Sequence, residues 1–262
     1  MNTLDPRKQQ EIDHHNMAEE LLLEHGEDLD KVLTNMKFYS IVRKSDEYAD
    51  SLFASSKGLD VLDYCCGNGH HALRLAETFG ANVTGIDLSD KRVESANREA
   101  AEKGLSETCR FFVMDAEHTT FADNSFDMIY CNGVLHHLDL DAAYKELARL
   151  LRPHGKIVAA EGLSHNPIIH TYRKLTPKLR TAWEMEHILS RGRIRQSKQY
   201  FDGLETRFFH LFTIAAAPFR KSPWLFNPVL TVMEWVDAVV LRIPGFRWWA
   251  WQCVFCMTKP KK

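Results

Sequence analysis

The sequence has neither a long apolar run nor an excess of charge of one sign. No segment reaches the roughly 18–20 uninterrupted apolar residues that a bilayer-spanning helix needs, so a transmembrane span is not expected. The chain has 33 Lys and Arg against 35 Asp and Glu, a net charge of −2. This balance gives no whole-molecule field that would hold a polyanion. Nucleic acid is therefore not an expected partner.

The first residues lack the apolar run of a secretory signal and lead instead into an acidic, histidine-containing stretch. The six cysteines are scattered, and no second Cys or His pair accompanies Cys253 and Cys256 at the spacing of a zinc site. These two are interpreted as strand residues. We expect a cytoplasmic protein with free thiols and no metal.

Periodicity divides the 262 residues into three regions. Residues 1–57 carry apolar side chains at three- and four-residue intervals, which predicts N-terminal helices that form a lid. Residues 58–161 alternate short apolar runs with amphipathic stretches and are predicted to be a cofactor-binding core. Residues 162–262 hold a substrate-region insert, rich in basic and aromatic side chains, and the last two strands.

Alternation of strand-like and helix-like segments predicts right-handed crossovers and a parallel sheet. The expected fold class is α/β, a Rossmann-like doubly wound seven-stranded mainly parallel sheet with N-terminal helices and a C-terminal helical and aromatic insertion. The predicted strands are 59–64, 82–87, 110–114, 126–131, 156–160, 206–214 and 251–257. The predicted helices of the core are 70–79, 90–103 and 139–151.

The most informative stretch, 61–72, is an apolar strand that ends in a glycine turn and opens a helix. Gly67 and Gly69 allow the backbone to approach a ligand, and the helix N-terminus presents unpaired N–H groups. Asp87 lies twenty residues beyond Gly67 at the end of the second predicted strand. A carboxylate there can accept the hydroxyl protons of a ribose, so the pattern predicts a nucleotide-like cofactor.

Charge separates two possible cofactors. The spacing of Gly67, Gly69 and Ala72 also fits the dinucleotide fingerprint, which alone is weak evidence. Asp63, at the mouth of the turn, would repel a pyrophosphate but attract the sulfonium and ammonium cations of S-adenosylmethionine. At an effective dielectric of about 20, one charge pair about 4 Å apart contributes about 4 kcal/mol. Asp63 therefore favours S-adenosylmethionine, and a nicotinamide-dependent oxidoreductase is the alternative.

Over residues 59–161 the sequence resembles the class I S-adenosylmethionine-dependent methyltransferases. The motifs that carry the resemblance are 63–69, 85–87, 114–117, 121–127, 132–138 and 151–156. It implies that the 65–69 turn holds the methionine and ribose, Asp87 the ribose hydroxyls, Asp115 with Ala116 the adenine, and that Asn132 lies beside the methionine. The expected cofactor-binding residues are Asp63, Cys65, Gly67, Gly69, Asp87, Leu88, Asp115, Ala116 and Asn132. Cys65 departs from the family, whose members commonly have glycine there.

Methyl transfer needs an aligned nucleophile and, where that nucleophile bears a proton, a base. Open α/β sheets place their ligands beyond the carboxyl ends of the strands, which makes His136, Glu161 and His165 the candidate catalytic residues. Helix capping, packing and capping of local N–H groups remain alternative roles for His136, its neighbour His137 and Glu161.

The run from Glu161 to Arg180 is similar to a segment of bacterial methyltransferases that act on small molecules or lipid-like substrates. This similarity implies that 161–204 shapes a substrate chamber, with Asn166, Tyr172 and Arg173 as substrate-binding residues. The arginines of this stretch are equally consistent with a solvated basic face.

Five of the six tryptophans, Trp224, Trp235, Trp248, Trp249 and Trp251, lie close to the C-terminus. The stretch 228–242 predicts an apolar helix interrupted only by Glu234 and Asp237. Its aromatic and arginine flanks are typical of an interfacial helix, and equally of a pocket cap or a homodimer face. Peripheral membrane contact and self-association both remain open.

The sequence thus predicts a methyltransferase that moves a methyl group from S-adenosylmethionine to O, N, S or C of a small, hydrophobic acceptor. One alternative is a methyltransferase that acts on an isoprenoid or lipid acceptor at the membrane surface. Another is a non-catalytic S-adenosylmethionine-binding scaffold.

Overall fold

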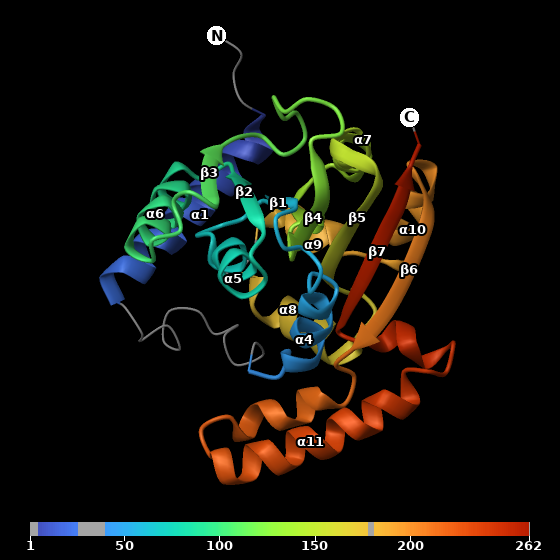
Figure 1. Ribbon diagram of the computed structural model, residues 1–262. Helices are drawn as coiled ribbons and strands as arrows, with labels where there is room; N and C mark the ends of the chain where they lie inside the picture. The colour runs from blue at the N-terminus through green and yellow to red at the C-terminus, as the bar shows by residue number, and fades with distance from the viewer. Residues whose placement is uncertain (1–4, 26–39, 178–180, 262) are drawn as a thin grey trace.

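The structure, a computed structural model, describes residues 5–25, 40–177 and 181–261 (Figure 1). Four positions of the predicted N-terminal helices, Leu29, Val32, Leu33 and Met36, lie outside the described residues, as does the basic Arg180.

A seven-stranded sheet forms the centre of the molecule, with strand order β3-β2-β1-β4-β5-β7-β6. The first five strands are parallel, and β7 runs antiparallel between β5 and β6. The strands are β1 (Asp60–Tyr64), β2 (Asn82–Asp87), β3 (Cys109–Val113), β4 (Phe126–Asn132), β5 (Leu151–Gly162), β6 (Phe201–Phe209) and β7 (Gln252–Pro260). The predicted fold class is confirmed.

Helices cover both faces of the sheet. They are α1 (Pro6–His25), α4 (Arg43–Ser51), α5 (His70–Phe79), α6 (Asp90–Glu102), α7 (Leu140–Leu150), α8 (Pro167–Leu175), α9 (Ala182–His187), α10 (Arg191–Gln196) and α11 (Pro223–Val240). Short 3-10 helices are η1 (Leu135–His137), η3 (Ser197–Gln199), η4 (Thr213–Phe219) and η5 (Phe246–Trp249). None of the helices in the described part of the chain is both long and apolar enough to span a bilayer.

Strand side chains alternate between two cores, one on each face of the sheet. Val61 packs with Leu73 of α5 on one face, and Leu62 packs with Tyr144 of α7 on the other. The two cysteines of β7 follow the same alternation, because Cys253 belongs to the second core and Cys256 to the first. They point to opposite sides of the sheet, as the interpretation of these cysteines as strand residues requires.

The strand predicted at 206–214 is displaced from its place in the structure, where β6 covers Phe201–Phe209. His210 has a φ of 66°, a left-handed conformation that ends the strand. The apolar residues that follow form η4 instead, and these pack with α11 and Trp251 in a small separate core. The single strand that the sequence predicts across Phe209 and Ile214 is thus divided between β6, which ends at Phe209, and η4, which contains Ile214.

The C-terminal helix α11 projects from the body beneath α4 (Figure 1). It begins at Pro223, five residues before the predicted start, and ends at Val240. Asp237 attaches it to the end of β6 by accepting hydrogen bonds from the backbone N–H groups of Leu211, Phe212 and Thr213 at 3.0, 2.7 and 3.2 Å.

The turn between β1 and α5 requires glycine at its last position. Gly69 has a φ of 79° and precedes the first residue of α5. A Cβ atom on Gly69 would lie 2.8 Å from Ala96 and from the ring of Phe111. Both the left-handed backbone and the underlying ring therefore exclude a side chain, because the turn packs directly against Phe111 of β3 and Ala96 of α6.

We expect Gly69→Ala to lower the free energy of unfolding by about 2–4 kcal/mol, from left-handed strain and overpacking together. Gly104→Ala is the matched control, because Gly104 has a φ of 69° and nothing within 4 Å of an added Cβ. It should show the strain alone, about 1–2 kcal/mol. Urea unfolding of both variants measures the difference, and equal losses would contradict the packing argument.

Candidate functional site

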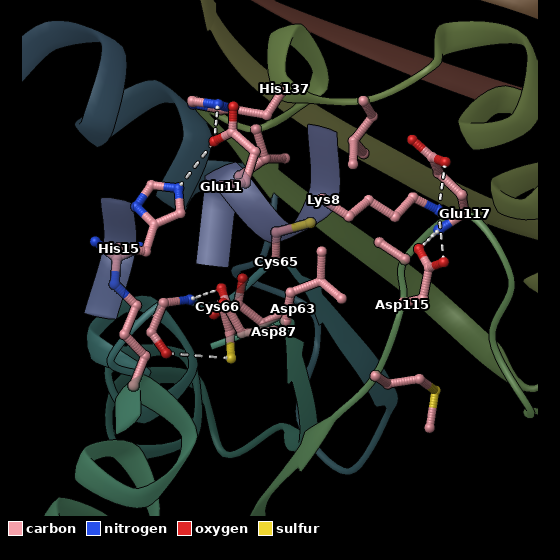
Figure 2. Close-up of a pocket in the computed structure, with 18 of the residues that line it drawn as sticks. Lys8, Glu11, His15, Asp63, Cys65, Cys66, Asp87, Asp115, Glu117 and His137 are labelled. Atoms are coloured by element: carbon pink, nitrogen blue, oxygen red, sulfur yellow. Dashed lines mark hydrogen bonds and ion pairs between the residues drawn. The ribbon is translucent and has the colours of Figure 1, made fainter. Parts of the chain in front are cut away.

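A cavity of about 210 Å³ lies at the carboxyl ends of β1, β2 and β4 and is covered by α1 (Figure 2). The turn, strand ends and loops contribute most of the side chains that the sequence analysis singled out for the cofactor. Those that line the cavity are Asp63, Cys65, Gly67, Asp87, Leu88, Asp115, Ala116 and Asn132. Gly69 is not among the lining residues and supports the turn from below.

The carboxylate of Asp87 is held by the backbone on both of its oxygens. Oδ2 accepts a hydrogen bond from the Gly67 N–H at 2.9 Å, and Oδ1 accepts one from the Ser89 N–H at 2.9 Å. Each oxygen retains a lone pair. The carboxylate is therefore fixed at the cavity wall and still able to accept protons from a ligand's hydroxyl groups.

Asp63 is buried at the back of the cavity, and its Oδ2 has no hydrogen-bond partner. Burial raises the pKa of Asp63 to about 7, aided by the nearby Asp87 and opposed by a backbone hydrogen bond from Ala72. A buried carboxyl oxygen without a partner costs about 1–3 kcal/mol, more when charged. A cationic ligand would supply the missing partner, so this group fits S-adenosylmethionine and not a pyrophosphate.

Cys65 adopts a left-handed backbone conformation, with a φ of 60°. For a residue with a Cβ this conformation costs about 1–2 kcal/mol, which is a physical reason for the glycine that the family commonly has there. Burial raises the pKa of the Cys65 thiol well above its usual value, so the thiol stays protonated at neutral pH. Its side chain narrows the cavity and is not an activated nucleophile.

The pair Asp115 and Ala116 closes the opposite side of the cavity. Asp115 Oδ1 accepts the Glu117 N–H at 3.0 Å, and Tyr64 donates its hydroxyl to the Ala116 carbonyl. Lys8 of α1 places its Nζ 2.6 Å from Asp115 Oδ2 and 2.7 Å from Glu117 Oε2. Burial lowers the pKa of Lys8, but hydrogen bonds to both carboxylates outweigh it and the pKa is raised.

A second contact of α1 joins it to the loop after β4. Glu11 Oε2 lies 3.0 Å from His137 Nδ1 and 3.4 Å from His15 Nε2, and Glu11 Oε1 accepts the hydroxyl of Thr181 at 2.6 Å. Although burial raises the pKa of Glu11, these hydrogen bonds hold it well below its usual range. Glu11 is therefore ionised, and it orients His137 at the cavity wall.

Four residues of α1 that no sequence motif marked as ligand-binding also line the cavity: Arg7, Lys8, Glu11 and His15. The signal for them was the acidic, histidine-containing stretch near the N-terminus. His15 and Glu11, four residues apart, share one face of a helix, but helical spacing alone does not say what that face meets.

Asn132 ends β4 with its side-chain Nδ2 2.6 Å from Nε2 of His71 in α5. Burial lowers the pKa of His71 to about 3, with Arg74 and His70 acting in the same direction. His71 is consequently neutral, and the contact fixes the amide of Asn132 beside the cavity.

Glu161 is 1% exposed at the end of β5, where it organises the loop after β4. Its Oε1 accepts the N–H groups of Val134 and Leu135 at 2.8 and 2.7 Å, and its Oε2 lies 2.9 Å from Nδ1 of His136. His136 is not among the residues that line the cavity, whereas His137, 4.3 Å away between ring centroids, is.

The remaining candidates lie away from this cavity. Asn166 caps α8 by accepting the N–H groups of Ile168 and Ile169 at 3.1 and 3.0 Å, and it donates to the Trp249 carbonyl at 2.8 Å. Arg173 is buried and donates to the Leu163 carbonyl at 2.9 Å. His165 contacts Trp248, and Tyr172 is half-buried on α8.

Comparisons with known proteins agree with this geometry. Residues 61–155 match the protein family described as "Methyltransferase domain". Sterol 24-C-methyltransferase erg6 of Aspergillus fumigatus is 35% identical over 119 residues, which are 45% of this chain and 32% of that protein. The chain thus matches about a third of the length of this curated relative.

Two solved structures share the fold. Geranyl diphosphate C-methyltransferase from Streptomyces coelicolor A3(2), in complex with Mg²⁺, geranyl diphosphate and S-adenosyl-L-homocysteine, has a TM-score of 0.58 at 20% identity, covering 83% of this chain and 80% of that one. The [4+2]-cyclase SpnF has a TM-score of 0.54 at 22% identity, covering 83% and 81%. At these identities the structures show the shared architecture alone.

The pKa of Asp63 leads to an expected pH dependence of cofactor binding. Only the ionised carboxylate attracts a cation, so the affinity for S-adenosylmethionine should rise with pH until Asp63 is ionised, near pH 7. Below that point it should fall by up to about tenfold for each pH unit. Calorimetric titration from about pH 5.5 to about pH 8.5 measures this slope.

Asp63→Asn should bind more weakly at high pH and lose most of the pH slope. A dinucleotide site would behave oppositely, because removing the negative charge would strengthen binding of a pyrophosphate. Affinity that is independent of pH in the unmodified protein would contradict the charge argument.

Cys65→Gly should bind S-adenosylmethionine more tightly, because it removes both the side chain in the cavity and the strain at a φ of 60°. Cys65→Ala is the matched variant, since it removes only the sulfur and keeps the strained Cβ. We expect the free energy of unfolding of Cys65→Gly to be unchanged or higher by up to about 1 kcal/mol, and that of Cys65→Ala not to show this gain. Dissociation constants equal in all three proteins would mean that Cys65 does not restrict the cofactor.

Proposed function

We propose that this chain, whose residues 61–155 match the methyltransferase-domain family, is a class I S-adenosylmethionine-dependent methyltransferase and transfers a methyl group from that cofactor to a small hydrophobic acceptor. The observation that carries the proposal is the cavity in which Asp63 and Asp87 meet a left-handed turn at the ends of β1 and β2. A buried carboxylate for a cation and a backbone-held carboxylate for hydroxyl groups are the two features that this cofactor needs.

In the proposed complex, Asp87 accepts hydrogen bonds from the ribose hydroxyl groups. Asp115 and Ala116 border the adenine. The methionine part is faced by Asp63, Gly67 and Asn132. S-adenosylmethionine supplies a methyl group that is already activated as an electrophile by its sulfonium. The chain itself has to exclude water, align the acceptor and hold a proton where one is released. The N-terminal region 1–57 is the proposed lid, and α1 already covers the cavity.

His137 is the proposed proton acceptor. His137 lines the cavity, and its Nδ1–H can donate a hydrogen bond to the ionised Glu11. In that tautomer the lone pair of Nε2 is available to accept a proton. Glu161, through the two N–H groups and His136 that it holds, positions the loop that carries His137. We propose positioning roles for Glu161 and His136, and residues 162–204 as the wall of the acceptor chamber.

The likeness to a sterol methyltransferase supports an apolar acceptor of the isoprenoid type. A lipid acceptor at a membrane surface is the second candidate, and the exposed apolar side chains of α11 favour it. A membrane surface is the partner proposed for this C-terminal segment, and a second copy of the chain is the alternative that an experiment has to distinguish.

Formation of S-adenosylhomocysteine with prenyl diphosphates, sterols and non-isoprenoid phenols tests the function. Where the acceptor releases a proton, His137→Gln should lower kcat by at least about 100-fold while cofactor affinity is retained. His154→Gln, an exposed histidine of β5, is the control and should be unaffected. His136→Gln should have a smaller effect on kcat, because His136 does not line the cavity.

Undiminished turnover by His137→Gln would remove His137 as the base. Cofactor binding without S-adenosylhomocysteine formation from any acceptor would instead contradict methyl transfer and favour the scaffold.

A further inference from the structure

An apolar stripe runs along the outer face of α11 and into η5. Its members follow helical spacing and are solvent-exposed, Trp224 to 78%, Trp235 to 74% and Val239 to 63% of their surface. The stripe consists of Trp224, Val232, Trp235, Val239, Ile243, Phe246 and Trp249. A helix of a water-soluble domain normally turns such side chains inward. A contiguous exposed patch of this kind marks an interaction surface.

The acidic residues of α11 point the other way. Glu234 pairs with Arg43 of α4 at 2.6 Å, and its side chain is only 8% exposed. Asp237 is 5% exposed and accepts the three N–H groups at the end of β6. These are the only acidic residues between 211 and 251. The two negative charges of α11 therefore lie against the protein, on the side where Leu230 is buried, while further apolar side chains occupy its outer face.

A basic groove of about 580 Å³ adjoins the stripe, between β6 and α11. Arg207, Arg242 and Arg247 line it, together with Trp235 of the stripe. Glu234 and Asp237 also line the groove, but their carboxylates are already engaged, by Arg43 and by backbone N–H groups. Arg207 lies over the ring of Tyr48 at 4.5 Å and Arg247 over Phe208 at 5.5 Å, but within the described chain none of the three arginines has a carboxylate at ion-pair distance. The Nε of Arg247 is buried and has no hydrogen-bond partner.

We propose that the stripe and the groove together dock the protein onto a bilayer that contains anionic phospholipid. The stripe enters the boundary between head groups and acyl chains, where tryptophan is favoured, and the arginines of the groove meet lipid phosphates. Residues 211–251 contain two acids, and both are nearly buried and already paired within the protein, so the unpaired charges of this surface are positive and complementary to an anionic surface.

The same charges disfavour a second copy of the chain as the occupant. A two-fold contact places the same patch on both partners, so Arg242 would face a surface on which the two carboxylates of residues 211–251 are already paired with Arg43 and with backbone N–H groups. The inward acids also attach α11 to β6 and α4, so the helix lies along a membrane as part of the folded domain and does not cross it.

Flotation of the full-length protein with vesicles of phosphatidylcholine alone, or of phosphatidylcholine with phosphatidylglycerol, tests the proposal. We expect binding to the anionic vesicles and a blue shift of tryptophan fluorescence. Trp235→Ser with Val239→Ser should lower the partition coefficient by more than about tenfold, and Arg242→Glu by on the order of tenfold. Free glycerol phosphate should not compete, since the site requires a bilayer.

Matched controls lie outside the stripe and groove. Leu175→Ser alters an apolar side chain of α8 that is 76% exposed, and Arg110→Glu reverses an exposed charge on β3, at the opposite edge of the sheet from β6. Both should bind vesicles like the unmodified protein. Retained cofactor binding shows that each variant is folded, and vesicle binding requires no methyl transfer, so this result is independent of the proposed function.

Three outcomes would overturn the proposal. These are no binding to anionic vesicles, equal binding to both lipid compositions, or equal binding by the stripe and groove variants and their controls. A concentration-dependent dimer by light scattering that the stripe variant abolishes would assign the surface to a second copy of the chain instead.

Discussion

Three carboxylates at the same edge of a parallel sheet are the constraint on which the rest of the site depends. Asp63, Asp87 and Asp115 follow or end neighbouring strands and line one cavity, so their negative charges are not dispersed. Each negative charge is compensated in a different way. Asp115 pairs with Lys8, Asp87 accepts hydrogen bonds from backbone N–H groups, and Asp63 has a raised pKa. Because Asp63 has a buried carboxylate oxygen with no hydrogen-bond partner, the site is suited to a cation.

The N-terminal helix α1 belongs to this site as much as the strands do. Lys8 meets the carboxylates after β3, and Glu11 meets His137 after β4. Both contacts involve an ionised carboxylate and are largely shielded from solvent, where electrostatic interactions are stronger than at the surface. Helix α1, which covers the cavity, is thus held by Asp115 and His137, two residues of the cavity wall. Cofactor binding is therefore linked to the position of α1.

The site buries polar side chains, whereas α11 exposes apolar ones. At the site, polar groups are buried and almost completely paired, with Glu161 alone accepting from two N–H groups and a histidine. On α11, apolar groups are exposed while Glu234 and Asp237 are used to hold the helix in place. Exposing tryptophan to water is unfavourable, and a protein that does so along one continuous face has placed that face against something apolar.

The sequence by itself determined the local architecture and the cofactor turn, because β2 and α5 have the bounds that their periodicity predicts and the glycines at 67 and 69 permit the left-handed backbone that the turn adopts. These features depend on neighbours in the chain. It did not determine that α1 covers the cavity, that His137 and not His136 lines it, that Asn166 and Arg173 bond to nearby backbone, or that the acids of α11 face inward. Helical spacing defines a face but not its partner, and only tertiary packing decides which face meets protein and which meets the surroundings.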